Sequence, residues 1–153
     1  MSIEARLAEL GITLPKAAAP VANYVPTVLH GNTLYISGQI PFREDGTLVL
    51  GRLGEDMDIE AGQAAARLCG IGILAQAQAA LGSLDRIERV LKLGAFVSCV
   101  PNFFDQPSIA NGCSDLMVEV LGDAGRHARS AVGVPALPRG VAVEVDAVIA
   151  VKV

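Results

Sequence analysis

The chain has 153 residues, of which 52% are hydrophobic, and its formal net charge at pH 7 is −4. This length suits one domain with a hydrophobic core, and the composition excludes a disordered chain. With only three lysines and no basic cluster, the sequence also argues against a protein that binds the phosphate backbone of nucleic acid.

The cysteines and the N-terminus indicate a compartment. Cys69, Cys99 and Cys113 form no CxxC pair, which argues against a disulfide framework or a structural zinc site and favours a reducing cytoplasm. Charges at Glu4 and Arg6 precede any apolar run, so we expect no signal peptide. The uncharged stretch 68–84 is interrupted by glutamines and glycines, and we interpret it as part of a buried helix rather than a membrane span.

The N-terminal part predicts one short helix and then strands. Residues 3–10 suit a helix that ends at Gly11, and the proline-containing residues 13–20 suit an extended connector. Two strand-like runs follow, at 24–29 and 33–37, and His30-Gly31-Asn32 between them is a turn signal. The polar segment 43–58 holds at most a short strand at 47–50.

Two long helices and a strong strand occupy the middle of the chain. Asp58 suits the N-cap of a helix over 58–81, whose small apolar residues recur at helical spacing. A strand follows, with one apolar face made by Leu91, Leu93, Ala95, Val97 and Cys99. The second helix is expected over 106–121, with Ile109, Cys113, Leu116 and Val120 as its buried stripe.

Residues 126–153 predict two further strands, 130–136 and 141–153, which we expect to form a hairpin through Leu137-Pro138-Arg139-Gly140. The odd positions of the last strand are all apolar, whereas its even positions include Glu144 and Asp146. A half-buried carboxylate such as Glu144 needs a partner or a function. Arg129 stands at the start of the preceding strand, so the hairpin would bring it near these carboxylates as a first candidate site.

The element order is β-β-(β)-α-β-α-β-β, which predicts an α+β fold with two helices on one face of a mixed sheet. The other face mixes charged and small apolar residues, for example Lys92 to Ser98 and Ala142 to Lys152. Such a face is too apolar for water, so we expect an oligomer interface there.

Common catalytic motifs are absent from the sequence: it contains no GxGxxG, GxxxxGK[ST], HExxH or GxSxG. His30 and His127 are far apart, and no cysteine stands at ligand spacing from either, so we expect no metal site. We interpret His127 as an exposed loop histidine, and Cys99 and Cys113 as buried apolar residues. The residues alone predict a carboxylate-binding pocket with acid/base chemistry.

The sequence resembles the reactive-intermediate deaminase family, RidA/YjgF. The similarity is carried by Asn23-Tyr24-Val25-Pro26, Leu34 to Pro41 with Ser37-Gly38-Gln39, Asn111, Ala128-Arg129-Ser130, Leu137-Pro138-x-Gly140 and Val143-Glu144-Val145. The match runs from about residue 19 to the end. This makes residues 19–153 the single family domain and residues 1–18 an N-terminal extension with a short helix.

The resemblance implies a bacillus-type chorismate mutase-like fold and a homotrimer with ligand pockets between subunits. It also implies hydrolysis of enamine and imine intermediates, such as 2-aminoacrylate and 2-iminopropionate, to a 2-keto acid and ammonia without a cofactor. Arg129 matches the arginine that grips the substrate carboxylate, and Glu144 the carboxylate that places or activates water. Tyr24, Ser37, Gly38 and Asn111 match pocket-lining positions.

The chain departs from many members at Ala131, where they have cysteine, although the backbone there can still contact a ligand. The N-terminal extension, the longer segment 43–58 and the run Gly125-Arg126-His127 indicate a divergent subgroup. Two alternatives remain: a non-catalytic protein that senses a small carboxylate, and an endoribonuclease, which the charge and the scattered histidines disfavour. The expected partners are a small 2-imino or 2-keto acid and further copies of the chain, with neither membrane nor nucleic acid.

Overall fold

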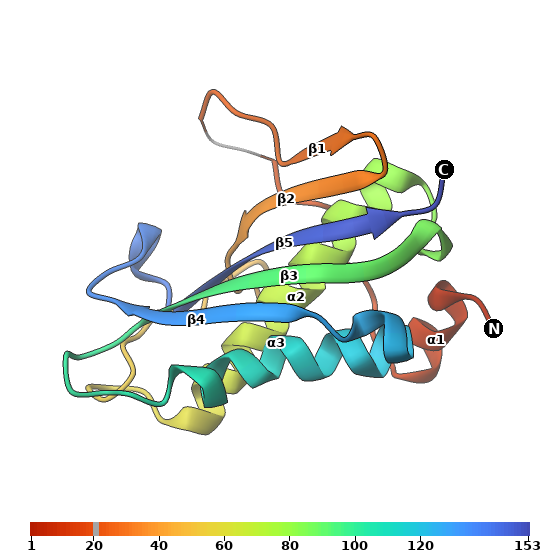
Figure 1. The fold of residues 1–153 in the computed structure, drawn as a ribbon. Helices are drawn as coiled ribbons and strands as arrows, with labels where there is room; N and C mark the ends of the chain where they lie inside the picture. Colours follow the sequence, from red (N-terminus) through yellow and green to blue (C-terminus); the bar gives the residue numbers. More distant parts are fainter. Residues whose placement is uncertain (20–21) are drawn as a thin grey trace.

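The computed structural model describes residues 1–19 and 22–153 and shows two long helices on one face of a five-stranded mixed sheet (Figure 1). The main elements are α1 (Ile3–Glu9), β1 (Thr27–His30), β2 (Thr33–Gln39), α2 (Ile59–Leu81), β3 (Ile87–Ser98), α3 (Gln106–Leu121), β4 (Ala128–Val134) and β5 (Val143–Val151). Short 3₁₀ turns, η1 (Leu84–Arg86), η2 (Gly122–Gly125) and η3 (Pro138–Gly140), join some of them. The predicted α+β class and layer arrangement are confirmed. Pro20, at the end of the predicted connector, lies outside the described residues.

The sheet order is β1-β2-β5-β3-β4, and only β3 and β4 run parallel. The predicted hairpin between the last two strands is therefore wrong: β5 lies between β2 and β3, and β4 forms the far edge beyond β3. The burial pattern gives the reason. Every odd position of β5 is buried, which needs helices over the strand and a neighbouring strand on each side. By contrast, the residues of β4 are exposed or only half-buried, as suits an edge strand.

The remaining predictions differ from the structure mainly at their ends. The strand expected from residue 91 begins at Ile87, and the strand expected over 24–29 covers Thr27–His30. The short strand expected at 47–50 is reduced to single bridges, Phe42 with Leu48 and Leu50 with Val141.

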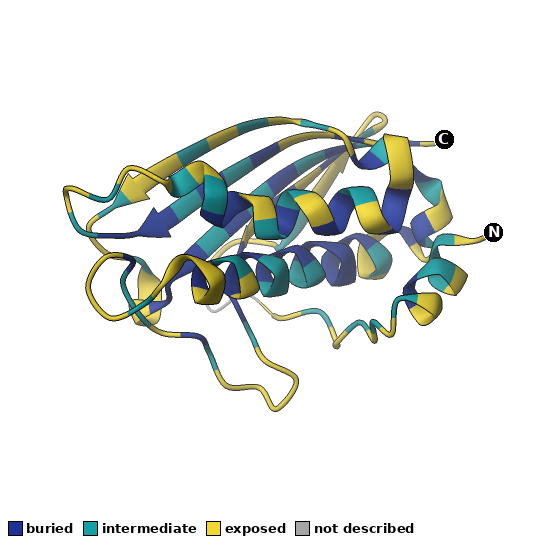
Figure 2. Cartoon of the chain, turned by 90° about the horizontal axis from the view of Figure 1, so that it is seen from below, coloured by how far each residue is buried: buried dark blue, intermediate teal, exposed yellow. Residues whose placement is uncertain are grey.

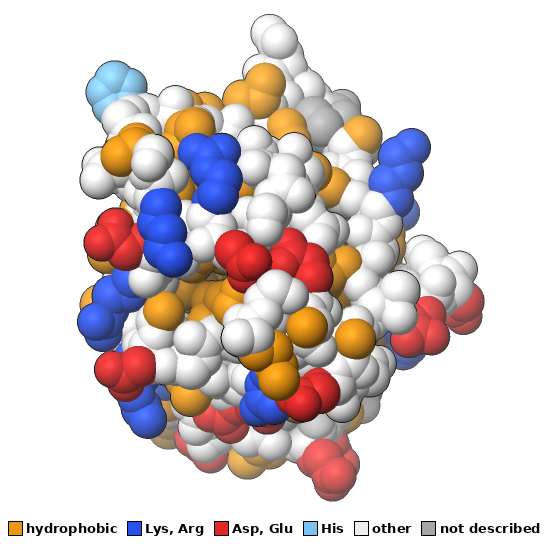
Figure 3. Space-filling model, turned by 90° about the vertical axis from the view of Figure 1, so that its right-hand side faces the viewer, with side chains coloured by type: hydrophobic (Ala, Val, Ile, Leu, Met, Phe, Trp, Pro, Cys, Tyr) orange, Lys and Arg blue, Asp and Glu red, His pale blue; other side chains and the backbone are white. Residues whose placement is uncertain are grey.

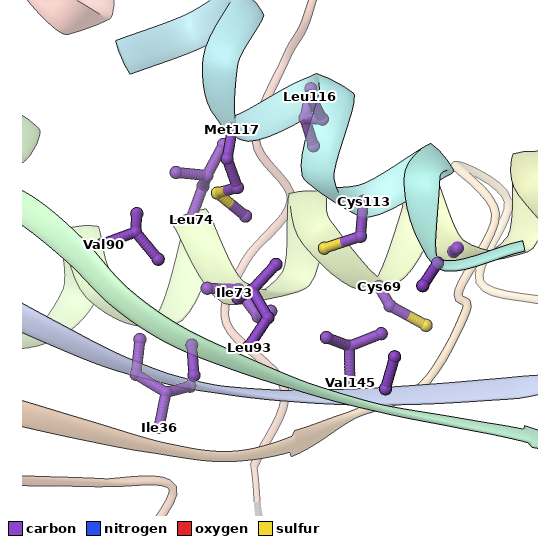
Figure 4. Close-up of a cluster of buried hydrophobic side chains, with 14 of the residues drawn as sticks. Ile36, Cys69, Ile73, Leu74, Val90, Leu93, Cys113, Leu116, Met117 and Val145 are labelled. Atoms are coloured by element: carbon purple, nitrogen blue, oxygen red, sulfur yellow. The ribbon is translucent and has the colours of Figure 1, made fainter. Parts of the chain in front are cut away.

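The core fills the layer between the sheet and the helices. Seen from below, α2 and α3 run side by side, with buried residues on the sides that face the strands and each other (Figure 2). Side chains from β2, α2, β3, α3 and β5 meet there, among them Ile36, Ile73, Leu93, Met117 and Val145 (Figure 4). Gly112 lets the helices approach closely, because a Cβ at this position would overlap the carbonyl of Gln63 on α2.

Helix α2 is long and apolar enough to cross a membrane by length and composition, but 56% of its most apolar window is buried inside the protein. Asp58 caps its first turn by accepting a hydrogen bond from the backbone amide of Ala61 at 2.8 Å. As expected from the sequence, it is the core helix of the fold.

The N-terminal extension packs on the domain. The backbone amide of Ile3 donates to Asp85 Oδ1, and the amide of Leu84 donates to Glu4 Oε1, both at 2.8 Å, so α1 and η1 cap each other. Leu7 is buried against the core. Further on, Gln76 Nε2 on α2 donates to the carbonyl of Ala18 at 2.8 Å. The division at residues 18 and 19 stays a prediction.

Candidate functional site

A β-bulge shapes the region around Glu144. Ile36 of β2 pairs with Ala147 of β5, but Gln39 pairs with Val145, so three steps on β2 match two on β5. Ser37 and Gly38 occupy the irregular stretch. Bulges interrupt the ladder and redirect side chains, and here the bulge lies against the strand that carries both candidate carboxylates.

Glu144 opens onto a cavity of about 270 Å³. Three residues that the sequence predicted as pocket-lining, Tyr24, Ser37 and Gly38, line the same cavity. Gly38 touches Glu144 so closely that a Cβ there would lie 2.7 Å from the Glu144 carboxyl carbon. A residue with a side chain at position 38 would displace the carboxylate, which gives a physical reason for glycine in Ser37-Gly38-Gln39.

The electrostatic environment of Glu144 favours its protonated form. Burial, and secondarily the neighbouring Asp146 on the same face, raise the pKa of Glu144 above its ordinary value. Burial also raises the pKa of Asp146, an effect that a hydrogen bond from the Gly94 backbone and the charge of Lys92 oppose. Among the described residues, no arginine, lysine or histidine lies within 4.0 Å of the Glu144 carboxylate. Glu144 is thus a proton acceptor whose affinity for protons is enhanced.

Arg129 lies at a second place, against helix α3. Its Nη1 donates to Asn111 Oδ1 at 2.9 Å and to Ser114 Oγ at 3.0 Å, and its Nη2 approaches the carbonyl of Pro107 at 3.4 Å. Asn111 and Ser114 are three residues apart on α3, so they share a face of the helix. Arg129 also lines a cavity of about 460 Å³ with Ser114, Asp115, Val118, Arg126 and His127.

Within one chain the two candidate catalytic residues lie on opposite faces of the sheet. Arg129 is the register partner of Leu93, whose side chain is buried under the helices, so Arg129 points to the helix side. Glu144 pairs with Phe96 and alternates with the buried Val143 and Val145, so it points to the face without helices. The expectation that Arg129 and Glu144 meet across a hairpin is therefore wrong for a single chain.

The histidine and cysteine predictions have mixed outcomes. His127 is not a freely exposed loop residue: it is half-buried, with Nε2 at 2.8 Å from Ser114 Oγ and Nδ1 hydrogen-bonded to the carbonyl of Gly125. Cys99 and Cys113 are buried, as expected, and Cys69 is buried too; all three are free. Burial raises the pKa of Cys113 to about 12 and that of Cys69 above its ordinary range, so neither thiol is activated as a nucleophile.

Ala131, the position where the family resemblance implies a cysteine, lies on the helix side of β4 opposite Ala95 and packs on the core. Within the described ranges 1–19 and 22–153, no group of three or more His, Cys, Asp or Glu residues could hold a metal ion.

Three residues of the site escaped the sequence reasoning. Ser114 had a detectable signal, its helical spacing from Asn111. Gln76 was visible only as a polar break in an apolar helix, yet it is buried and binds the connector that lines the Glu144 cavity. Arg139 lines this cavity too, and its backbone adopts a φ of 60°, which is rare for a residue other than glycine. Its position depends on a turn geometry that the sequence did not specify.

These features define a small α+β domain with an oriented arginine on one face of its sheet and a half-buried carboxylate in a cavity on the other. A family model described as "YjgF/chorismate_mutase-like, putative endoribonuclease" matches residues 4–148. The chain belongs to this family, the RidA/YjgF family, and the resemblance seen in its sequence is confirmed.

Individual relatives cover nearly the whole chain. Protein TCP17 of Trypanosoma cruzi is 51% identical over 148 residues, which cover 96% of this chain and 92% of the relative. A 2-iminobutanoate/2-iminopropanoate deaminase of Dermatophagoides farinae is 30% identical over 142 residues, with coverage of 92% and 95%.

Among solved structures, protein Atu1372 of Agrobacterium tumefaciens is 50% identical and superposes with a TM-score of 0.91, covering 98% of this chain and 92% of that one. TdcF of E. coli, solved with bound serine, is 27% identical with a TM-score of 0.65 and coverage of 90% and 94%. The common fold is thus established, including its chorismate mutase-like class.

Proposed function

We propose that this protein is a hydrolytic deaminase of reactive 2-imino acids, of the 2-iminopropionate and 2-aminoacrylate type. It releases a 2-keto acid and ammonia without a cofactor. The observation that carries the proposal is Glu144, a half-buried carboxylate with a raised pKa in a small cavity. The name of the relative from Dermatophagoides farinae supports the reaction, and serine in TdcF supports a ligand with an amino acid carboxylate.

Arg129 holds the substrate carboxylate. Both Nη1 hydrogens are committed, one to Asn111 and one to Ser114, and one Nη2 hydrogen faces the carbonyl of Pro107. An arginine has five N–H donors. The donors that remain are Nε–H and one N–H of Nη2, which lie on the same edge of the guanidinium. That edge matches a carboxylate with two parallel hydrogen bonds, which lysine cannot offer.

Glu144 acts on water. As a carboxylate it accepts a proton while the water oxygen attacks the imine carbon, and it returns this proton to the nitrogen, which gives a tetrahedral carbinolamine. Glu144 then takes the proton of the new hydroxyl group and delivers it to the amino group while the C=O bond forms and the C–N bond breaks, so that ammonia leaves the 2-keto acid. A base works best when its pKa lies near the working pH, and the raised pKa of Glu144 moves it in this direction.

The complete site is formed between copies of the chain. Because Arg129 and Glu144 lie on opposite faces of the sheet, a ligand that contacts both needs one residue from each of two subunits. The uncovered face can provide the interface: the register aligns Val28, Tyr35 and Val148 in a row across it, and the first two are about half exposed. We propose the homotrimer that the family resemblance implies.

The remaining candidate residues shape the two halves of this site. Tyr24, Ser37 and Gly38 line the Glu144 half, with Gly38 fixing the carboxylate. Asn111 orients Arg129, and Ala131 lies two residues after Arg129 on the helix side of β4, where we assign its backbone to the second half.

The endoribonuclease of the family description is not the activity that we propose. Cleavage of RNA needs cationic surface for the phosphates, but the net charge is −4. On the end of the molecule in Figure 3, Lys and Arg side chains are interspersed with Asp and Glu side chains.

The test compares two variants with the parent in a coupled assay of keto acid release from freshly generated 2-iminopropionate. Arg129→Lys keeps the charge but loses the two-donor edge, so pyruvate binding should weaken by about 1.5–3 kcal/mol. Glu144→Gln keeps the size but removes the base, so turnover should fall by about 10²–10⁴ while pyruvate affinity changes little.

A parent without turnover but with Arg129-dependent pyruvate binding would indicate a sensor of small carboxylates. Pyruvate binding that is unchanged in Arg129→Lys would refute the carboxylate site itself. If Glu144→Gln lowered rate, affinity and melting temperature together, Glu144 would be a structural residue instead.

A further inference from the structure

A line of hydrogen bonds extends from Arg129 away from the ligand-facing edge of its guanidinium. Arg129 Nη1 donates to Ser114 Oγ at 3.0 Å, Ser114 Oγ lies 2.8 Å from His127 Nε2, and His127 Nδ1 lies against the carbonyl of Gly125. It connects β4, helix α3 and the segment that leads from η2 into β4. The function proposed above uses only its first residue, Arg129.

The line ends at the Arg129 guanidinium and at the Gly125 carbonyl, and the chemistry of these two groups fixes the direction of each hydrogen bond when His127 is neutral. The Gly125 carbonyl can only accept, so the proton of the ring is on Nδ1. The guanidinium can only donate, so Ser114 Oγ accepts from Arg129 and its own hydrogen is directed to Nε2. Neutral His127 therefore acts as an acceptor that holds the Ser114 hydroxyl in one rotamer, with an oxygen lone pair facing Arg129.

Two arginines and one carboxylate share the surroundings of His127. Arg129 and Arg126 line the same cavity as His127, and Asp115 is the acidic residue that lines it. Arg126 itself pairs with Asp123 at 3.1 Å on the surface and takes no part in the hydrogen-bonded line.

We propose that His127 and Ser114 are positioning residues, which hold Arg129 so that its Nε and Nη2 edge is presented to the substrate carboxylate. Without the Ser114 oxygen, one Nη1 hydrogen loses its acceptor on α3, and the guanidinium is held only by Asn111 and the Pro107 carbonyl. His127 acts only through Ser114 and does not touch the substrate. This inference rests on the proposed role of Arg129.

The experiment is a double-mutant cycle on the full-length protein, with pyruvate affinity and the kinetics of 2-iminopropionate hydrolysis as readouts. Ser114→Ala and His127→Ala should each weaken pyruvate binding about five- to tenfold, the range of one oriented hydrogen bond. KM should rise accordingly, with kcat changed by less than about twofold. The double variant should bind no more weakly than Ser114→Ala alone, because His127 has nothing left to orient.

Two further variants complete the design. His127→Gln offers an amide oxygen near the place of Nε2, so it should restore most of the affinity that His127→Ala loses. Arg67→Ala removes a cation that pairs with Glu119 at 3.1 Å and lines neither the Glu144 cavity nor the Arg129 cavity, so it should stay within about twofold of the parent. Melting temperatures show that each variant is folded.

The outcomes separate the two proposals. If Arg129→Lys does not weaken pyruvate binding, the proposed function fails, whatever the cycle gives. If Arg129→Lys weakens binding but Ser114→Ala does not, the positioning role is refuted and the proposed function stands. An effect of His127→Ala that persists in the Ser114→Ala background, or a failure of His127→Gln to restore affinity, also overturns the inference.

Discussion

Glu144 is a half-buried carboxylate whose negative charge opposes folding at neutral pH. The folded chain partly removes this carboxylate from water beside Asp146, and both effects raise its pKa. A folded-state pKa above the unfolded value means that the folded protein binds more protons than the unfolded chain between the two values. The free energy of unfolding therefore falls as the pH rises through this window, and the charged Glu144 destabilises the fold at neutral pH.

Glu144→Gln should accordingly raise the melting temperature at pH 7, by no more than about 2–4 °C, because solvent screens a side chain that is only partly buried. The gain should disappear below the ordinary pKa of a glutamate, near pH 4, where the parent carboxyl is protonated in both states. Melting curves at the two pH values check this, with Glu88→Gln at an exposed position of β3 as the control. An equal shift at both pH values would contradict a charge-based cause.

Gly38→Ala is the sharpest test of the contact between the bulge and Glu144. The new Cβ would lie 2.7 Å from the carboxyl carbon, and the flexible end of Glu144 would have to move. We expect imine hydrolysis to fall by about 10²-fold, the cost of a misplaced catalytic group, with little change in melting temperature. Gly94→Ala is the matched control, because it displaces Asp146 instead. Equal rate losses in both variants would show that Glu144 has no special role.

At the scale of elements, helices α2 and α3 approach each other through glycine. A Cβ at Gly112 would meet the Gln63 carbonyl, which is backbone and cannot move without shifting the helix. By contrast, a Cβ at Gly70 would meet the ends of Leu116 and Cys113 at 2.8 and 3.0 Å, and these side chains can adjust. The spacing of the two helices thus depends more on Gly112 than on Gly70.

Gly112→Ala should lower the free energy of unfolding by about 1–3 kcal/mol or more, as overpacking does, despite the better helix propensity of alanine. Gly70→Ala should cost clearly less. Urea denaturation of both variants measures the difference. A Gly112→Ala variant as stable as the parent would mean that the helices slide apart without loss of packing.

At the scale of the whole molecule, the proposed assembly would cover the exposed sheet face and bring Arg129 of one copy near Glu144 of another. The row formed by Val28, Tyr35 and Val148 would be covered in such an assembly, together with the half-buried carboxylates beside it.

Light scattering of the purified protein should therefore give about three times the chain mass of 15.8 kDa at micromolar concentration. Val148→Lys places a charge in the middle of the row and should shift the protein toward monomers, with loss of turnover. Ile59→Lys, at the exposed start of α2, should leave the assembly intact. A stable monomer for the parent would remove the proposed site between subunits.

Much of the fold could be predicted from the sequence because local patterns carry it. The apolar spacing of Ile109, Cys113 and Leu116, the cap at Asp58 and the alternation from Val143 to Val151 each reflect a period of helix or strand. The same patterns indicated a half-buried Glu144, and the family resemblance named Arg129 and Gly38.

Only the tertiary structure decided which strands are neighbours and which faces the site residues share. Strand β5 has β2 on one side and β3 on the other. No local pattern of residues 126–153 contains this arrangement, so the sequence predicted a hairpin of β4 and β5, whereas β3 lies between them. The partners of Arg129 likewise come from α3 and from the segment before β4, and their hydrogen bonds exist only once these segments pack. The sequence by itself determined the elements and the candidate residues; the packing of β5 into the middle of the sheet placed Arg129 and Glu144 on opposite faces.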